Sequence, residues 1–176
     1  MGGTGEAKAA GNYAGSLLPA KLANEAGYDQ VMWLDAKEFK WIQEVGTMNI
    51  FFVIDGKVIT PATSGTILKG ITRDSILKIL RAKGYDCEER PISIDEVIEA
   101  SKAGKLKECF GAGTAAVVVN VSKIKYNDIV MNLPPVAKRE VSALAKETIN
   151  GIRARTIEDE FGWIVPVKEV PTEATV

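Results

Sequence analysis

Four short apolar runs between residues 29 and 61 constrain the fold most strongly. Turn-forming residues separate the runs, which cover residues 30–34, 40–45, 49–54 and 57–60. Asp55-Gly56, between the last two runs, is a strong signal for a two-residue β-hairpin. Because the connections are so short, neighbouring runs are expected to pair antiparallel. This part of the chain therefore predicts a β-meander.

Four other segments repeat apolar residues at the helical period of three to four positions. Their apolar faces are Leu17, Leu18, Leu22 and Ala23; Ile76, Leu77, Ile79 and Leu80; a face within residues 93–103; and Val141, Leu144, Ala145, Thr148, Ile149 and Ile152. Gly27 and Gly84 are expected to end the first two helices. Ser93 followed by Glu96 matches a capping box that opens the third.

The second half of the chain adds four expected strands. They cover residues 87–92, 108–111, 115–121 and 128–133. Glycines at 111 and 113 are expected to break the second of them, and the continuous apolar run of the third predicts burial on both faces. Together with the helices, this pattern predicts one α/β (α+β) domain with a mostly antiparallel sheet.

Composition excludes several classes of function. The chain of 176 residues has no histidine, which removes every arrangement of Ser, Cys or metal with His. Its net charge of -1 gives no reason to expect nucleic acid as a partner. The two cysteines stand apart without metal-ligand spacing, so we expect reduced thiols and no metal site. No apolar run approaches the roughly 20 residues that span a bilayer, so we expect a cytoplasmic protein without membrane contact.

The residues that could carry chemistry are individually ordinary. Lys8 lies among glycines with Tyr13 five positions later, and Glu44 ends an apolar strand just before a glycine. Residues 70–72 form a loop that enters a helix, where free backbone N–H groups can bind an anion. Residues 111–114 can form a backbone nest of the same kind. Each also has a plain structural interpretation, namely a solvated lysine, a half-buried tyrosine, an exposed acid, a helix cap and a β-bulge.

Taken together, these segments resemble a known family. Residues 2–8 with 11–13, 44–49, 65–68 with 70–73, and 113–115 are similar to motifs of the branched-chain amino-acid aminotransferases, in the same order and with similar spacing. These are class IV (fold type IV) pyridoxal-phosphate enzymes, and the resemblance covers residues 2–167. It implies their large domain, in which a mostly antiparallel sheet or pseudo-barrel carries flanking helices. It also implies pyridoxal 5'-phosphate as cofactor and a homodimer. The reaction implied is amino transfer between leucine, isoleucine or valine and 2-oxoglutarate.

The resemblance also assigns roles to residues. Lys8 resembles the lysine that bonds the cofactor and moves the substrate proton, Tyr13 the phenol on the 3'-oxygen, and Glu44 the carboxylate facing the pyridine nitrogen. The remaining positions resemble groups that bind phosphate or substrate: Ile71 and Thr72 through backbone N–H groups, Thr114 through its hydroxyl, Thr114 and Ala115 towards the substrate carboxylate, and Thr47 as part of the pocket wall.

The chain departs from the family in extent. It resembles only the second of two domains, so residues 1–167 are expected to form that domain and 168–176 a frayed tail. The smaller N-terminal domain, which supplies an arginine to the phosphate, is not recognised, and we expect a truncated or split reading frame. Ala116 and Val119 stand where animal members carry a Cys-x-x-Cys.

Three functions remain open at this stage. The first is branched-chain transamination. The second is another class IV reaction, that of a D-amino-acid aminotransferase or an aminodeoxychorismate lyase. The third is a catalytically silent fragment that acts only with a separate N-terminal chain.

Overall fold

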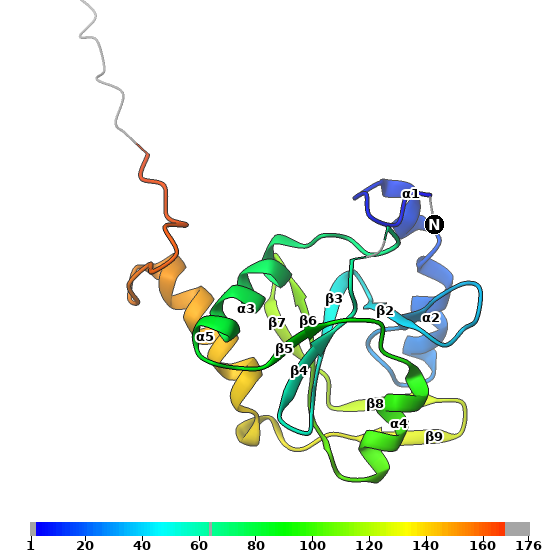
Figure 1. The fold of residues 1–176 in the computed structure, drawn as a ribbon. Helices are drawn as coiled ribbons and strands as arrows, with labels where there is room; N and C mark the ends of the chain where they lie inside the picture. Colours follow the sequence, from blue (N-terminus) through cyan, green and yellow to red (C-terminus); the bar gives the residue numbers. More distant parts are fainter. Residues whose placement is uncertain (1–2, 64, 168–176) are drawn as a thin grey trace, which may run out of the picture.

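The computed structural model describes residues 3–63 and 65–167, and Figure 1 shows their arrangement. A seven-stranded, mostly antiparallel sheet forms the centre, with helices on both faces, as expected from the sequence. The predicted tail at 168–176 lies outside the described residues.

The β-meander is confirmed. It consists of β1 (Met32–Leu34), β2 (Ile42–Val45), β3 (Met48–Ile54) and β4 (Lys57–Thr60), each paired antiparallel with the next. Asp55 and Gly56 both have positive φ, 52° and 82°, which is the backbone of the type I′ turn predicted for this dipeptide.

Strand β6 (Leu106–Gly113) is longer than expected. It pairs antiparallel with β3 and β7, while β5 (Cys87–Glu89) pairs parallel with β4. The prediction that glycines interrupt this strand is wrong. A Cβ at Gly111 would lie 2.8 Å from Met48 Cε, so the missing side chain lets Met48 pack against an unbroken strand.

The predicted strand at 115–121 is shorter and less buried than expected. β7 covers Val117–Asn120, while Ala115 and Ala116 lie exposed in the turn before it. Val119 is 38% exposed, so burial on both faces is wrong for this strand. The strand predicted at 128–133 is β9 (Ile129–Asn132). It pairs with β8 (Lys123–Tyr126), which the sequence reading missed.

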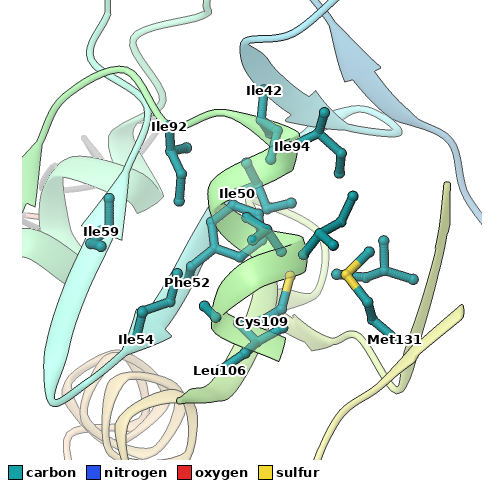
Figure 2. Close-up of a cluster of buried hydrophobic side chains, with 14 of the residues drawn as sticks. Ile42, Ile50, Phe52, Ile54, Ile59, Ile92, Ile94, Leu106, Cys109 and Met131 are labelled. Atoms are coloured by element: carbon teal, nitrogen blue, oxygen red, sulfur yellow. The ribbon is translucent and has the colours of Figure 1, made fainter. Parts of the chain in front are cut away.

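Both faces of the sheet are covered, because β3 alternates its side chains between two cores. Ile50, Phe52 and Ile54 pack with α4 (Ile94–Lys102) and the β8–β9 pair, as the close-up in Figure 2 shows. Phe51 and Val53 pack on the other face with α3 (Ile71–Ala82) and α5 (Glu140–Ala154), which follows the 3-10 turn Val136–Lys138. Phe51 stacks on Phe110 of β6 with ring centroids 5.1 Å apart. The central strands therefore lie between two cores.

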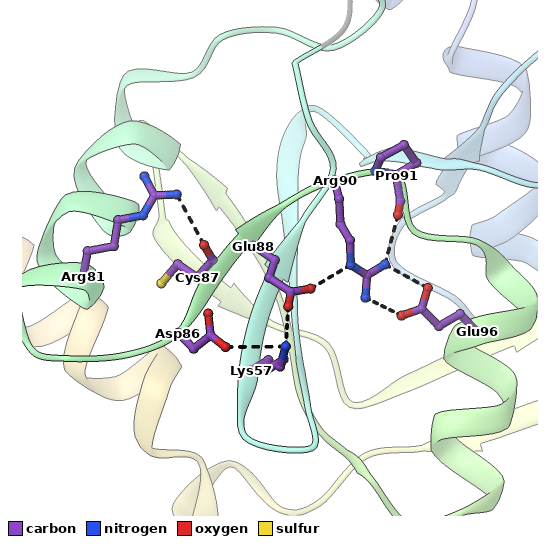
Figure 3. A network of polar contacts seen from close by, with 8 residues as sticks. All are labelled: Lys57, Arg81, Asp86, Cys87, Glu88, Arg90, Pro91 and Glu96. Carbon is purple, nitrogen blue, oxygen red and sulfur yellow. Dashed lines mark hydrogen bonds and ion pairs between the residues drawn. The ribbon is translucent and has the colours of Figure 1, made fainter.

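The predicted apolar faces of α3 and α5 are buried, and the capping box of α4 is formed in part. Ser93 Oγ accepts a hydrogen bond from Glu96 N at 3.1 Å. The Glu96 side chain turns away to Arg90, which also binds Glu88. Glu88 in turn pairs with Lys57, and Figure 3 shows this chain of ion pairs, which ties β5 to β4 and to α4.

The first two helices lie at the edge of the molecule. Neither α1 (Ala10–Ala14) nor α2 (Leu17–Glu25) contains a buried residue. The predicted helix is present in α2, but its leucines are exposed. Leu17, Leu18 and Leu22 are 71%, 65% and 55% accessible.

Candidate active site

A cavity of about 370 Å³ lies where the N-terminal segment meets the meander and the loop before α3. The N-terminal segment with α1 and the loop before α3 lie at the top of Figure 1. Tyr13 and Glu44, two of the predicted site residues, line it. The other lining residues are Gly5, Ala7, Asn12, Gly15, Ser16, Trp33, Leu34, Asp35, Ala36, Gln43, Gly46, Thr66 and Leu68. The volume is in the range of small-molecule sites.

Glu44 is the most perturbed acid of this cavity. It lies half-buried on β2, and its Oε1 accepts hydrogen bonds from Asn49 Nδ2 at 3.0 Å and from the backbone N of Leu68 at 3.2 Å. Among the described residues, none donates to Oε2. Burial raises the pKa of Glu44 to about 7, although the Leu68 N–H and the charge of Lys8 act in the opposite direction. Near neutral pH this carboxyl group can therefore exist in both protonation states.

Lys8 and Tyr13 belong to the N-terminal segment. Lys8 is exposed, with its Nζ 5.6 Å from the centroid of the Tyr13 ring, and it is close enough to Glu44 to lower that pKa. Asn12 fixes the turn that carries Lys8, because its Nδ2 donates to Thr4 O at 2.6 Å and to Ala7 O at 2.9 Å. The Tyr13 phenol and the Glu44 carboxylate, from separate elements, thus line one cavity, and the Lys8 amine lies close to both without lining it.

A glycine allows the N-terminal segment to lie this close to the loop before α3. A Cβ at Gly5 would lie 2.6 Å from Thr66 O, so only glycine permits this approach. Thr66 Oγ1 donates to Gln43 Oε1 at 2.6 Å, which ties the loop to β2 as well.

The predicted anion-binding residues lie outside the lining of the cavity. Ile71 and Thr72 open α3, Ile71 79% exposed and Thr72 buried. Gly70 precedes them, and no side chain of the described residues caps the helix. The first backbone N–H groups of an uncapped helix are available to an anion.

Thr47, Thr114 and Ala115 are exposed in two turns at one end of the sheet. Thr47 lies in the β2–β3 turn, and the other two lie between β6 and β7. The turns are neighbours, because a Cβ at Gly113 would lie 3.1 Å from Met48 Cγ. In the structure these residues stand near the cavity end of β3 and do not line the cavity itself.

Several lining residues were missed by the sequence reading. Trp33 Nε1 donates to Gly46 O at 2.9 Å, which fixes the turn after Glu44. Asp35 accepts four backbone N–H groups of residues 37–41, and these lower its pKa to about 2. It thereby orders the β1–β2 loop beside the cavity. An aspartate at the end of a strand, followed by a short polar loop, is the signal that could have revealed it.

Two kinds of feature are not found in the described part of the chain. Residues 3–63 and 65–167 contain no cluster of three or more cysteine, aspartate or glutamate side chains arranged to hold a metal ion. In the same residues, no helix combines the length and the apolar character that crossing a membrane requires.

Comparison with known proteins relates the chain to one family. Residues 5–124 match the family model of amino-transferase class IV. Branched-chain-amino-acid aminotransferase 2 of Bacillus subtilis is 48% identical over 166 residues, which are 94% of this chain and 46% of that protein.

Two solved structures are also similar. The Escherichia coli branched-chain amino acid aminotransferase superposes with a TM-score of 0.74 at 30% identity, covering 93% of this chain and 49% of the other. The branched-chain amino acid aminotransferase of Thermobaculum terrenum, solved in its PLP-form (holo-form), gives a TM-score of 0.69 at 29% identity, covering 86% and 48%.

The chain spans about half the length of the curated relatives it matches. The family model, by contrast, covers more than half of this chain, and the fold agrees with that of the solved class IV enzymes. The chain therefore belongs to the amino-transferase class IV family.

Proposed function

We propose that this chain is the cofactor-binding domain of a pyridoxal-phosphate-dependent branched-chain aminotransferase. The reaction would be reversible amino transfer between leucine, isoleucine or valine and 2-oxoglutarate. The observation that carries the proposal is that Tyr13 and Glu44 line one cavity, with the Lys8 amine close to both.

The residues present fit pyridoxal phosphate. Glu44 offers an oxygen that accepts no hydrogen bond from the described residues. A pyridinium N–H at this oxygen would favour the ionised carboxylate and so offset the effect of burial on its pKa. The uncapped N-terminus of α3, at Ile71 and Thr72, suits a phosphate dianion. Thr114 and Ala115 offer a hydroxyl and backbone N–H groups at the same end of the sheet.

Each side chain then has a distinct task. When bound, the cofactor acts as an electron sink for the substrate α-carbon. Glu44 keeps the ring nitrogen protonated, which maintains that sink. Lys8 would bond the cofactor and move the α-proton, and Tyr13 would donate to the 3'-oxygen. The expected part of Thr47 in the pocket wall is not carried over, because Thr47 does not line the cavity.

The relatives support the cofactor and the substrate class. The Bacillus subtilis relative is named for branched-chain amino acids, and the Thermobaculum terrenum enzyme was solved in its PLP-form. The choice of 2-oxoglutarate as amino acceptor rests on the family resemblance of the motifs. In this proposal residues 1–167 form the large domain, and the complete enzyme is a cytoplasmic homodimer with a small N-terminal domain that completes the phosphate site.

A second candidate is a catalytically silent domain that acts only with a separate N-terminal partner. Another class IV reaction, that of a D-amino-acid aminotransferase or an aminodeoxychorismate lyase, would use the same domain with a different substrate pocket.

Titration with pyridoxal phosphate tests the proposal. We expect absorbance changes typical of a lysine-bound cofactor, and slow leucine–2-oxoglutarate turnover that rises when the N-terminal half of the Bacillus subtilis relative is added. Lys8→Met is the matched control and should abolish both signals. Absence of cofactor binding with and without the added half would contradict the proposal. Cofactor binding with turnover that appears only when the N-terminal half is added would favour the silent fragment.

A further inference from the structure

Asn49 joins two parts of the site without lining the cavity. It lies on β3 and is only 5% exposed. Its Nδ2 donates to Glu44 Oε1 at 3.0 Å and to Leu68 O at 2.9 Å, so both amide protons are used. A buried side chain whose donors are divided between a carboxylate and a loop fixes the position of one relative to the other.

The opposite side of the same amide touches the start of α3. A Cβ built at Gly70 would lie 2.1 Å from Asn49 Oδ1. Gly70 has φ -65° and ψ 130°, which any residue can adopt, so the lack of space and not the backbone requires glycine here. Asn49 is therefore enclosed by Glu44, Leu68 and the residue that precedes the helix.

We propose that Asn49 is a positioning residue that holds the Glu44 carboxylate and the N-terminus of α3 as one unit. The contacts to the cofactor's ring nitrogen and to its phosphate would then be set together. This reading of the two contacts rests on the proposed function, whereas the coupling between Glu44 and the loop does not.

Other groups near Glu44 also act on its pKa, and the test must separate their effect from that of Asn49. The Lys8 ammonium acts on Glu44 from the N-terminal segment, and Tyr13 lines the same cavity. The Arg73 guanidinium is directed away, to Pro61 O and Glu89. Changes at Asn49 leave these groups in place. Because an N–H donor favours the ionised carboxylate, loss of the Asn49 donor should raise the pKa of Glu44.

The first experiment needs no cofactor. The Glu44 carboxyl carbon is titrated by ¹³C NMR in wild type, Asn49→Ala, Gly70→Ala and the double variant. We expect each single change to raise the Glu44 pKa by about one pH unit, because a hydrogen bond to a charged group is lost. The double variant should titrate like Asn49→Ala alone, because both changes act through one amide.

Thr60→Val is the matched control. Thr60 is equally buried on the neighbouring strand, and its Oγ1 donates to Ile50 O at 2.7 Å, away from Glu44. It should lower stability and leave the Glu44 pKa unchanged. An unchanged pKa in the Asn49 variant, or additive effects in the double variant, would overturn the proposal. Should Asn49→Ala fail to fold, Gly70→Ala decides alone.

The second experiment measures pyridoxal phosphate affinity from quenching of Trp33, which lines the cavity. We expect about ten- to hundredfold weaker binding in Asn49→Ala and Gly70→Ala, and little change in Thr60→Val. If both variants bind pyridoxal phosphate as tightly as the wild type does, the positioning role is overturned. Failure of the wild type to bind would count against the proposed function, while the NMR titration would still decide the coupling.

Discussion

At Glu44, stability and proposed function make opposite demands: burial disfavours the ionised carboxylate, whereas the proposed contact to the pyridine nitrogen requires it. Its pKa is raised from 4.5 to about 7, so the folded chain holds a proton that the unfolded chain has lost. Stability is therefore lost as pH rises from about 4.5 to about 7. In Glu44→Gln, the amide oxygen can still accept both hydrogen bonds that now end on Oε1. We expect this variant to gain about 1–2 kcal/mol over wild type between pH 5 and pH 8, after discounting for solvent screening.

Urea unfolding at the two pH values measures this difference. Glu38→Gln, an exposed acid in the β1–β2 loop, is the control and should show no such trend. The same Glu44 variant should bind pyridoxal phosphate more weakly, since an amide cannot balance a pyridinium charge. A Glu44→Gln chain with wild-type pH dependence would show that the residue is ionised throughout.

Lys8 makes a second prediction at this scale. We expect borohydride reduction of the cofactor complex to leave the label on the peptide that contains Lys8, because this amine lies beside Tyr13 and Glu44. Peptide mass mapping locates the adduct. Lys69 also lies near the N-terminal segment, paired with Glu6 at 3.4 Å. Label on Lys69 would show that the assignment is mistaken.

The sequence located the residues whose neighbours in the chain are distinctive. Glycines and strand position single out Lys8, Tyr13 and Glu44; the fold places Tyr13 and Glu44 in one cavity and Lys8 close to both. Trp33 could not be found in this way, because its role depends on what lies across the β1–β2 pairing. Contacts between elements leave no local pattern in the sequence.

At the scale of an element, the N-terminus of helix α5 is capped by a residue of strand β6. Glu108 of β6 is 4% exposed, and its two carboxylate oxygens each accept a backbone N–H, from Val141 and Ser142, at 2.8 Å. In Glu108→Gln one of these N–H groups would face an amide N–H₂. We expect a loss of about 2–4 kcal/mol in the free energy of unfolding.

Chemical denaturation measures this loss. Glu99→Gln is the control, because Glu99 is an exposed acid on α4 whose ion pair among the described residues is with Lys102, and it should cost less than about 0.5 kcal/mol. Equal effects of the two changes would mean that the buried carboxylate does not stabilise the start of α5.

Elements with strong local signals were predicted well. The Asp55-Gly56 turn and the apolar faces of α3 and α5 can be predicted from the local sequence alone. β8 was missed because lysines alternate with its apolar residues on a surface hairpin. β6 was predicted too short, because glycines within a strand are typical of a break. The packing of Met48 against Gly111, which requires the glycine, depends on a distant part of the chain. The errors therefore fall where a distant side chain decides the local structure.

At the scale of the whole molecule, α2 presents an unusual surface. Leu17, Leu18 and Leu22 are all more than half exposed on one helix. Adjacent exposed leucines favour association. We expect the chain to self-associate with increasing concentration in sedimentation velocity, and the triple change of these leucines to Gln to shift it towards monomer. Val136→Gln removes an isolated exposed residue and should have no effect. Monomeric wild type at all concentrations would contradict this.

The lack of buried residues in α1 and α2 has a consequence for motion. Amides of the β3–β6 ladder lie between two cores and should exchange with solvent only on global unfolding, whereas those of residues 10–25 should exchange through local opening. Tyr13 then stands on the part that opens, with Lys8 just before it, and Glu44 stands on the part that does not. Hydrogen-exchange mass spectrometry should show pyridoxal phosphate slowing exchange in residues 5–25 and leaving β3 unchanged. The site would be half preformed and half closed by its own ligand.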